Sequence, residues 1–271
     1  MVAVRRRGEI LENNFLASPC LCAPYDHQIL IQEDFSCAAK AYNDAIDKSV
    51  NDLMVFCHQD LLLPEAWLSQ LEQALNYLQG NDPKWGVLGS IGRCQDGGTR
   101  GHVFSSGRGV IRMTCDRPEP IQTLDEIVLI LRKSSGLRFD DRLPHFHLYG
   151  ADICLRAAKM GMKSYAIPAF CIHNTHQNFI LAPEFYECCK HIKRVWKDSL
   201  PIQTTCGRIT RFNVTLYIQR AREFYMKHIR RKEFGGTRTK DVQRLLQEFG
   251  ATSDDSELGS YNSRTISSAA Q

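Results

Sequence analysis

Short apolar runs alternate with amphipathic stretches between residues 28 and 175, and this alternation restricts the fold more than any other feature of the chain. The runs 28–32 and 53–57 have the length and apolar content of buried strands. Between them, Ala39, Tyr42 and Ile46 recur at helical spacing, and Ser36 is placed to cap the helix. A strand, a helix and a second strand in this order predict an α/β fold whose mostly parallel sheet is flanked by helices.

The rest of the chain extends the same pattern. Strands are expected at 85–92, 126–133 and 164–173, and helices at 64–80 and 151–161. The glycine-rich stretch up to about Pro120 predicts loops or a short hairpin. Helices should dominate from 181 to 232, and the serine-rich end predicts disorder. We therefore expect a main domain, a helical extension and a disordered tail, over residues 1–200, 201–252 and 253–271.

Composition is that of an ordinary globular protein, with 43% apolar and 24% charged residues. No run approaches the roughly 20 apolar residues that span a bilayer, and the first residues lack the pattern of a signal peptide. We expect a cytoplasmic protein whose eleven cysteines are mostly buried, reduced thiols, because they contain no C-x-x-C pair and are odd in number. Aromatic residues are not interleaved with the basic clusters, so no nucleic-acid partner is expected.

His58 and Asp60 follow directly after the apolar run 53–57. Because residues two apart in an extended chain point to the same side, both side chains can address one point at the end of the strand. Ligands of open α/β sheets bind outside the carboxyl ends of the strands, where an imidazole and a carboxylate can hold a divalent cation against a diphosphate. The alternative is a hydrogen-bonded histidine beside an aspartate that caps the next helix.

Several motifs, in order, resemble the family-2-like glycosyltransferases of GT-A fold, and most closely a bacterial branch in which His-Gln-Asp replaces the acidic D-x-D triplet. The matching stretches are Asn43 to Ile46, VFCHQD, LDEIVLILRKSSGLRFDDRL, HLYGADICLRAAKMG and YAIPAFCIHNT. The resemblance covers roughly residues 28–175. It implies a GT-A-like, Rossmann-like mixed sheet and transfer of a sugar, with inversion, from a nucleotide-diphosphate donor to a hydroxyl on a glycan or lipid-linked acceptor, in cell-surface glycan synthesis.

The resemblance also implies roles for individual residues. Metal ligands would be His58, Asp60 and His173, holding Mn²⁺ or Mg²⁺. The donor would meet Glu33, Asp34, Asn43, Asp60 and Asp125, and the acceptor would meet His145, His147 and Tyr149. Asp152 would be the base that removes the acceptor proton, as a partly desolvated carboxylate beside a loop; its alternative is the N-cap of a helix. His173 has the alternative of a strand-end histidine bonded to backbone, and Asp125 that of an ordinary strand-start residue.

Three questions stay open at this point. The first is the function itself. One alternative to a glycosyltransferase is a binding module that kept the fold and lost turnover. Another is a metal-dependent phosphoesterase, although the sites of such enzymes usually group more carboxylates. The basic stretch 208–232 contains Ile209, Phe212, Leu216 and Phe224, which predicts either an interfacial helix that binds anionic lipid or a helix packed on the domain by those residues. The basic residues themselves could equally form a solvated face.

Overall fold

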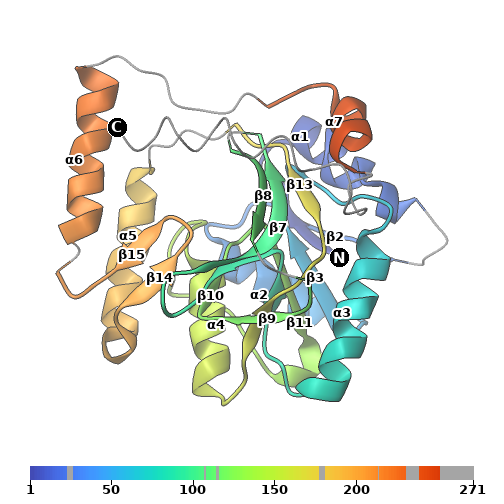
Figure 1. Cartoon of the computed structure of the whole chain (residues 1–271), viewed down its shortest axis with the longest axis horizontal. Helices are drawn as coiled ribbons and strands as arrows, with labels where there is room; N and C mark the ends of the chain where they lie inside the picture. Colours follow the sequence, from blue (N-terminus) through green and yellow to red (C-terminus); the bar gives the residue numbers. More distant parts are fainter. Residues whose placement is uncertain are drawn as a thin grey trace.

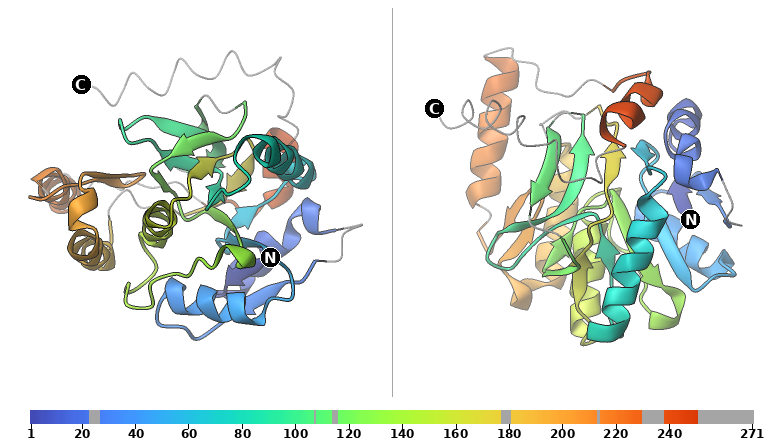
Figure 2. Two further views of the ribbon diagram at one scale, coloured as in Figure 1. Left: turned by 90° about the horizontal axis from the view of Figure 1, so that it is seen from below. Right: turned by 45° about the vertical axis from the view of Figure 1, so that its right-hand side comes forward.

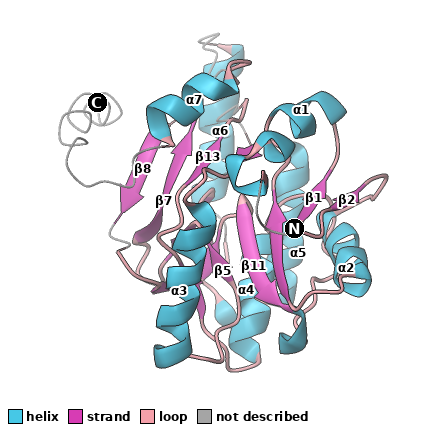
Figure 3. Ribbon diagram, turned by 90° about the vertical axis from the view of Figure 1, so that its right-hand side faces the viewer, coloured by secondary structure: helices cyan, strands magenta, loops and turns pink. Residues whose placement is uncertain are grey.

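The structure is a computed structural model that describes residues 1–22, 27–106, 108–113, 116–176, 181–212, 214–229 and 238–250. Its centre is a seven-stranded mixed sheet with helices on both faces (Figures 1 and 3). Five strands run in one direction and two run against them. In spatial order they are β2 (Leu30–Gln32), β1 (Val2–Val4), β3 (Leu53–Cys57), β11 (Val128–Arg132), β5 (Leu88–Gly89), β12 (Ser164–Ala166) and β9 (Glu119–Ile121). The predicted α/β class with a mostly parallel sheet is confirmed.

The central strands are buried on both faces, and their side chains alternate between two cores. Met54 and Phe56 of β3 face the core under α2 (Ala38–Lys48), α4 (Tyr149–Lys159) and α5 (Pro183–Val195). Val55 and Cys57 face the core under α1 (Gly8–Asn13) and α3 (Trp67–Asn81). This alternation with a period of two is what a strand requires, and it explains why β3 reads as a continuous apolar run.

A second sheet lies over one end of the first. Its order is β10 (Thr123–Leu124), β6 (Ile91–Arg93), β7 (Thr99–Ser105), β13 (Cys171–His173) and β4 (Leu61–Leu62), with β8 (Gly109–Met113) paired to β7. The predicted strand 85–92 is therefore divided at Ser90, and the predicted strand 164–173 is divided around Pro168. In both cases the first half joins the central sheet and the second half joins the other sheet.

Some sequence predictions differ from the structure at the ends of elements. Cys37, not Ser36, precedes α2, and no side chain caps that helix. Helix α3 begins at Trp67, three residues after Pro64, because Leu61 and Leu62 pair as a strand. The glycine-rich stretch contains the long hairpin of β7 and β8. The predicted disordered tail lies outside the described residues.

The C-terminal part contains more than helices. After α5, a hairpin of β14 (Ile202–Thr204) and β15 (Gly207–Ile209) interrupts the predicted helical region. Helix α6 (Val214–His228) then stands at one edge of the molecule, and α7 (Val242–Phe249) lies on the second sheet (Figures 1 and 2). No helix of the described residues has the length and apolar character needed to cross a membrane.

Candidate functional site

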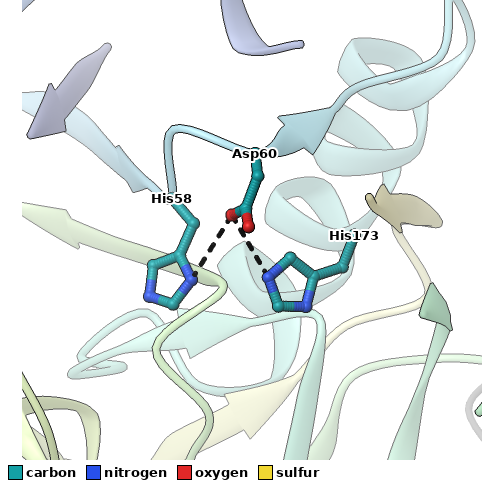
Figure 4. Close-up of side chains that lie close together, drawn as sticks. All are labelled: His58, Asp60 and His173. Carbon is teal, nitrogen blue, oxygen red and sulfur yellow. Dashed lines mark ion pairs between the residues drawn. The ribbon is translucent and has the colours of Figure 1, made fainter. Parts of the chain in front are cut away.

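The loop after β3 of the central sheet and the end of β13 of the second sheet bring His58, Asp60 and His173 together (Figure 4). His58 and Asp60 follow β3, and Asp60 precedes the short strand β4. Strand β4 pairs antiparallel with β13 so that His173 lies opposite Leu61. The amide of Asn174 also donates to the carbonyl of Asp60, at 2.9 Å. This register, which joins residues more than a hundred positions apart, places His173 beside Asp60.

The carboxylate of Asp60 lies between the two imidazoles. Its Oδ1 is 3.3 Å from His173 Nε2 and 4.0 Å from His58 Nδ1. The ligand atoms of the three residues all lie within 4.8 Å of one another. Two ligands that share a cation at about 2.0–2.2 Å lie roughly 3–4 Å apart, so a small inward movement suffices to close the site on an ion. Two nitrogens and one carboxylate oxygen form a donor set that accepts Mn²⁺.

The second nitrogen of His58 has a partner that fixes the ring. His58 Nε2 lies 3.0 Å from the hydroxyl of Tyr149, which is itself 3% exposed. A ligand histidine is usually oriented by a hydrogen bond at its other ring nitrogen, and Tyr149 has the position of that partner. Tyr149, which the resemblance places on the acceptor side, lies beside His58 in the structure.

Arg238 is a member of the site that the sequence did not indicate. Its Nη2 donates to Asp60 Oδ2 at 2.8 Å, and its Nε donates to the carbonyl of Asn174 at 2.9 Å. The next residue is held as well, because Thr239 and the buried side chain of Asn174 exchange two hydrogen bonds of 2.9 and 3.0 Å. The second carboxylate oxygen of Asp60 is thus already paired with the positively charged guanidinium of Arg238.

The charges of the site follow from these contacts. Burial by itself would raise the pKa of Asp60, but His173, His58 and Arg238 outweigh it and lower that pKa. Burial would likewise lower the pKa of His173, but Asp60 outweighs it and raises that pKa. Burial and His173 together lower the pKa of His58 in spite of Asp60. These shifts favour the charged forms of Asp60 and His173 and the neutral form of His58.

Asp152 does not have the surroundings of a base. It is fully buried on α4, where Oδ2 accepts from Arg156 Nε at 2.6 Å and Oδ1 accepts from Trp196 Nε1 at 2.7 Å. A base must come within hydrogen-bond reach of its substrate, and both oxygens are occupied away from any surface. The structure thus places Asp152 in a fully buried position and not in the partly desolvated one that was predicted, and its role as the base stays a prediction. The N-cap alternative is wrong, because α4 begins at Tyr149 and is preceded by Leu148.

Asn43 is also structural. Its amide group exchanges two hydrogen bonds with the backbone of Phe139, at 2.9 and 3.0 Å, and donates to Asp141 at 2.6 Å. Both polar atoms of the side chain hold the segment after β11 against α2. The amide group of Asn43 is thus used within the chain, and its contact with the donor stays a prediction.

The other predicted donor residues lie near strand ends. Glu33 and Asp34 follow β2; Glu33 pairs with Arg5 at 2.9 Å, and Asp34 has a positive φ of 61°. Asp125 accepts from Thr205 Oγ1 at 2.5 Å and from the amide of Ile127 at 3.2 Å. Asp125 is close enough to raise the pKa of His173. No hydrogen bond or ion pair among the described residues joins Glu33 or Asp34 to the histidines.

The predicted acceptor-side histidines contact α5. His145 Nε2 lies 2.7 Å from Glu187 Oε2, and the ring of His147 lies 5.9 Å from that of Phe185. Burial lowers the pKa of His147. These two residues therefore form a connection between the segment before α4 and the first half of α5.

Glu126, next to Asp125, is a further carboxylate near the site. Burial and then Asp125 raise its pKa to about 8, while the amides of Leu148 and Gly150 at the start of α4 offset part of that rise. Glu126 nevertheless keeps part of its surface exposed. Gly150 allows the approach of helix and strand, because a Cβ there would lie 2.7 Å from the carbonyl oxygen of Leu124. The acidic pair in LDE was the signal in the sequence that could have indicated Glu126.

No protein-family model matches the chain. A curated protein described as ATP synthase subunits region ORF 6, from Fuscovulum blasticum, is 32% identical over 136 residues, which are 48% of this chain and 53% of that protein. The chain thus spans about half the length of this relative.

Solved structures with a similar arrangement include three proteins. GalNAc-T7 with UDP, GalNAc and Mn²⁺ is 10% identical, with a TM-score of 0.47 over 85% of this chain and 56% of that one. The mannosyltransferase PcManGT from Pyrobaculum calidifontis, in complex with GDP-Man and Mn²⁺, is 12% identical, with a TM-score of 0.44 over 84% and 69%. TarS from S. aureus is 11% identical, with a TM-score of 0.43 over 85% and 72%.

Proposed function

We propose that the protein is a glycosyltransferase that moves a sugar from a nucleotide-diphosphate donor to a hydroxyl. The convergence of His58, Asp60 and His173 at the carboxyl edge of the central sheet carries this proposal. The three residues are those to which the family resemblance assigns the cation and the diphosphate, and they lie far apart in the sequence. The finer parts of the proposal follow the resemblance: inversion, an acceptor that is a glycan or lipid-linked, and a role in cell-surface glycan synthesis at the inner face of the membrane.

A divalent cation, Mn²⁺ or Mg²⁺, would be held by His58 Nδ1, His173 Nε2 and Asp60 Oδ1. Bound there, it would supply positive charge to the leaving diphosphate. Arg238 offers a second positive group at the same place, because its guanidinium already lies on the other oxygen of Asp60. Asp125, which is adjacent and held by Thr205, is proposed to meet the donor sugar.

Glu126 replaces Asp152 as the proposed base. A carboxylate that is partly enclosed and still accessible can receive the proton of the acceptor hydroxyl as that oxygen attacks the anomeric carbon and the nucleotide diphosphate leaves. The pKa of about 8 favours this exchange, since a proton acceptor works best when its pKa is close to the operating pH. His145 and His147 are proposed to line the acceptor side next to it.

The first test is a thermal-shift screen of UDP- and GDP-sugars with and without Mn²⁺. A donor at 100 times its dissociation constant should raise the melting temperature by about 5 °C, because about 2.7 kcal/mol of binding is added to the folded state alone. Asp60→Asn should remove the part of the shift that requires Mn²⁺, and Asp116→Asn, at an exposed site, should leave it intact. The proposal fails if no nucleotide sugar stabilises the parent protein.

A second prediction concerns the tyrosine behind His58. Tyr149→Phe should weaken Mn²⁺ binding by about 10–100-fold, as measured by calorimetry, because the ring of His58 loses the partner that orients it. Tyr217→Phe, on an exposed tyrosine, is the matched control. Equal affinities in parent and Tyr149→Phe would show that Tyr149 has no part in holding a cation.

A binding module without turnover is the second candidate, and the Arg238–Asp60 ion pair favours it, because this pair already neutralises the carboxylate. The two candidates, the enzyme and the binding module, can be separated by measuring slow hydrolysis of the donor that the screen identifies. An enzyme of this kind passes the sugar to water at a measurable rate when no acceptor is present. A module that binds the donor and leaves it intact over hours would establish the second candidate.

A further inference from the structure

Helix α6 is attached to the domain by a narrow and mostly polar inner face. Leu216 is 2% exposed and packs in the core beside β15, close to Gly207. Glu223 accepts a hydrogen bond from Gln219 at 2.9 Å and a long one from the amide of Leu181. The guanidinium of Arg220 lies 5.0 Å from the ring centre of Tyr186 on α5. Among the described side chains of α6, Leu216 and these polar contacts therefore attach the helix, and Met226 is half-buried.

The outer face of the same helix is apolar. Seven of the thirteen large hydrophobic side chains that are exposed in the described part of the chain lie between 212 and 229. They are Phe212 (74%), Val214 (55%), Tyr217 (61%), Ile218 (62%), Phe224 (62%), Tyr225 (44%) and Ile229 (64%). Positions 214, 217, 218, 221, 224, 225 and 228 follow the spacing of a single helical face. The amphipathic helix is thus oriented with its apolar side toward solvent.

Each of the two alternatives for this stretch describes two of its four apolar residues. Ile209 and Leu216 pack on the domain, as the packed-helix reading requires, but Phe212 and Phe224 point outward. Single exposed apolar residues are normal on a protein surface. A continuous apolar face on one helix, in contrast, marks a surface that is covered by a membrane or by another molecule.

The charges around this face indicate what covers it. The stretch 208–232 contains eight lysines and arginines and a single acidic residue, Glu223, which is turned inward to Leu181 and Gln219. Arg211 and Arg222 are exposed beside the apolar face. A second copy of the chain would bring two such basic faces together and repel, whereas anionic headgroups would neutralise them while the aromatic residues enter the interface.

We propose that α6 is a membrane-binding helix that lies in the interface of a bilayer containing anionic lipid. Its position also concerns the acceptor. His145 and His147 contact Glu187 and Phe185 on α5, and α6 rests on the same helix through Tyr186. The bilayer would therefore lie on the acceptor side of the domain, and this consequence, unlike lipid binding itself, rests on the proposed sugar transfer.

The test is co-sedimentation of the full chain with vesicles of phosphatidylcholine alone and with 30% phosphatidylglycerol. Binding should be at least about 10-fold stronger to the anionic vesicles and should weaken as salt is raised. The double variant Ile218→Asp/Phe224→Asp should lose binding to both, because charged groups replace the inserting side chains. Arg222→Glu should reduce only the anionic preference.

The controls are Val50→Asp and Lys84→Glu, which change an exposed valine and an exposed lysine away from α6 and should bind as the parent does. Equal binding to neutral and anionic vesicles, or none, overturns the proposal. So does a dimer in solution that Ile218→Asp/Phe224→Asp dissociates without any vesicle binding, since the face then serves a second copy. The donor-induced thermal shift, measured on the same variants, shows separately whether the nucleotide-sugar site is intact.

Discussion

Asp152→Ala is expected to lower the free energy of unfolding by about 3 kcal/mol. The substitution leaves the indole nitrogen of Trp196 without its acceptor in the core, and it takes one of two carboxylates from Arg156. A buried donor that loses its partner costs about 1–3 kcal/mol, and disruption of a buried ion pair costs more. Arg156 keeps Asp140 at 2.8 Å, which limits the loss.

This loss of unfolding free energy can be measured by urea denaturation of three proteins, namely the parent, Asp152→Ala and Asp152→Asn. The asparagine variant can still accept from Trp196, but it presents an NH₂ group to the guanidinium of Arg156, so about 1–3 kcal/mol should be lost. Asp116→Ala, at an exposed aspartate, should change stability by less than about 0.5 kcal/mol. Asp152 would be functional after all if its variants kept the parent stability and lost donor turnover.

The fold was predictable where a local pattern determines an element. Strand β3 matches the predicted run 53–57, and α2 carries the predicted stripe of Ala39, Tyr42 and Ile46 in its buried face. The expectation of mostly buried, reduced thiols also agrees with the ten described cysteines, all of which are free and seven of which are buried. Period and composition suffice for such features because the residues that decide them are neighbours in the sequence.

The division of two predicted strands was not predictable in this way. At Ser90 and around Pro168 the apolar character continues while the chain passes from one sheet to the other. A hydrophobic run indicates burial but does not indicate which partner strand forms the hydrogen bonds. The same limit hid β4, whose two residues form a strand only because β13 pairs with them.

The same distinction, between features set by sequence neighbours and features set by distant partners, applies to the functional site. His58 and Asp60 were predictable as neighbours on one strand end, and the resemblance added His173. Arg238 belongs to a segment with no periodic or motif signal, and it reaches Asp60 across 178 positions through contacts with Asn174. The burial of Asp152 was not predictable, because α4 begins at Tyr149, two residues before the predicted start at 151, and turns that side chain inward to Trp196.

The second large effect is expected for Glu126→Gln. Glutamine has the shape of the neutral acid but cannot take a proton, so transfer, or donor hydrolysis in the absence of an acceptor, should fall by about 10²–10⁴-fold while the donor-induced thermal shift stays intact. Folding at pH 7 should change little, since a pKa of about 8 already keeps most of Glu126 protonated. Glu72→Gln, on the exposed side of α3, is the matched control.

The pH dependence distinguishes a base from a structural acid at this position. The turnover of the parent should rise as Glu126 loses its proton around pH 8, and the variant should lack this rise.

The stability of the protein should depend on pH through the same residue. The folded-state pKa of Glu126 is raised above its usual value of 4.5, so the stability that Glu126 contributes is complete below about pH 4.5 and is lost as the pH rises through about 8. The glutamine variant should lack this dependence as well. The titratable groups that interact electrostatically with Glu126 are Asp125, Tyr42, Tyr149, Cys154, Cys188 and Cys206. Burial raises the pKa of both tyrosines and all three thiols, so they stay neutral across this range and Asp125 is the charge that acts on Glu126. If the variant lost the stability slope but kept the parent turnover at every pH, Glu126 would be a buried structural acid, and the acceptor proton would have to leave by another group.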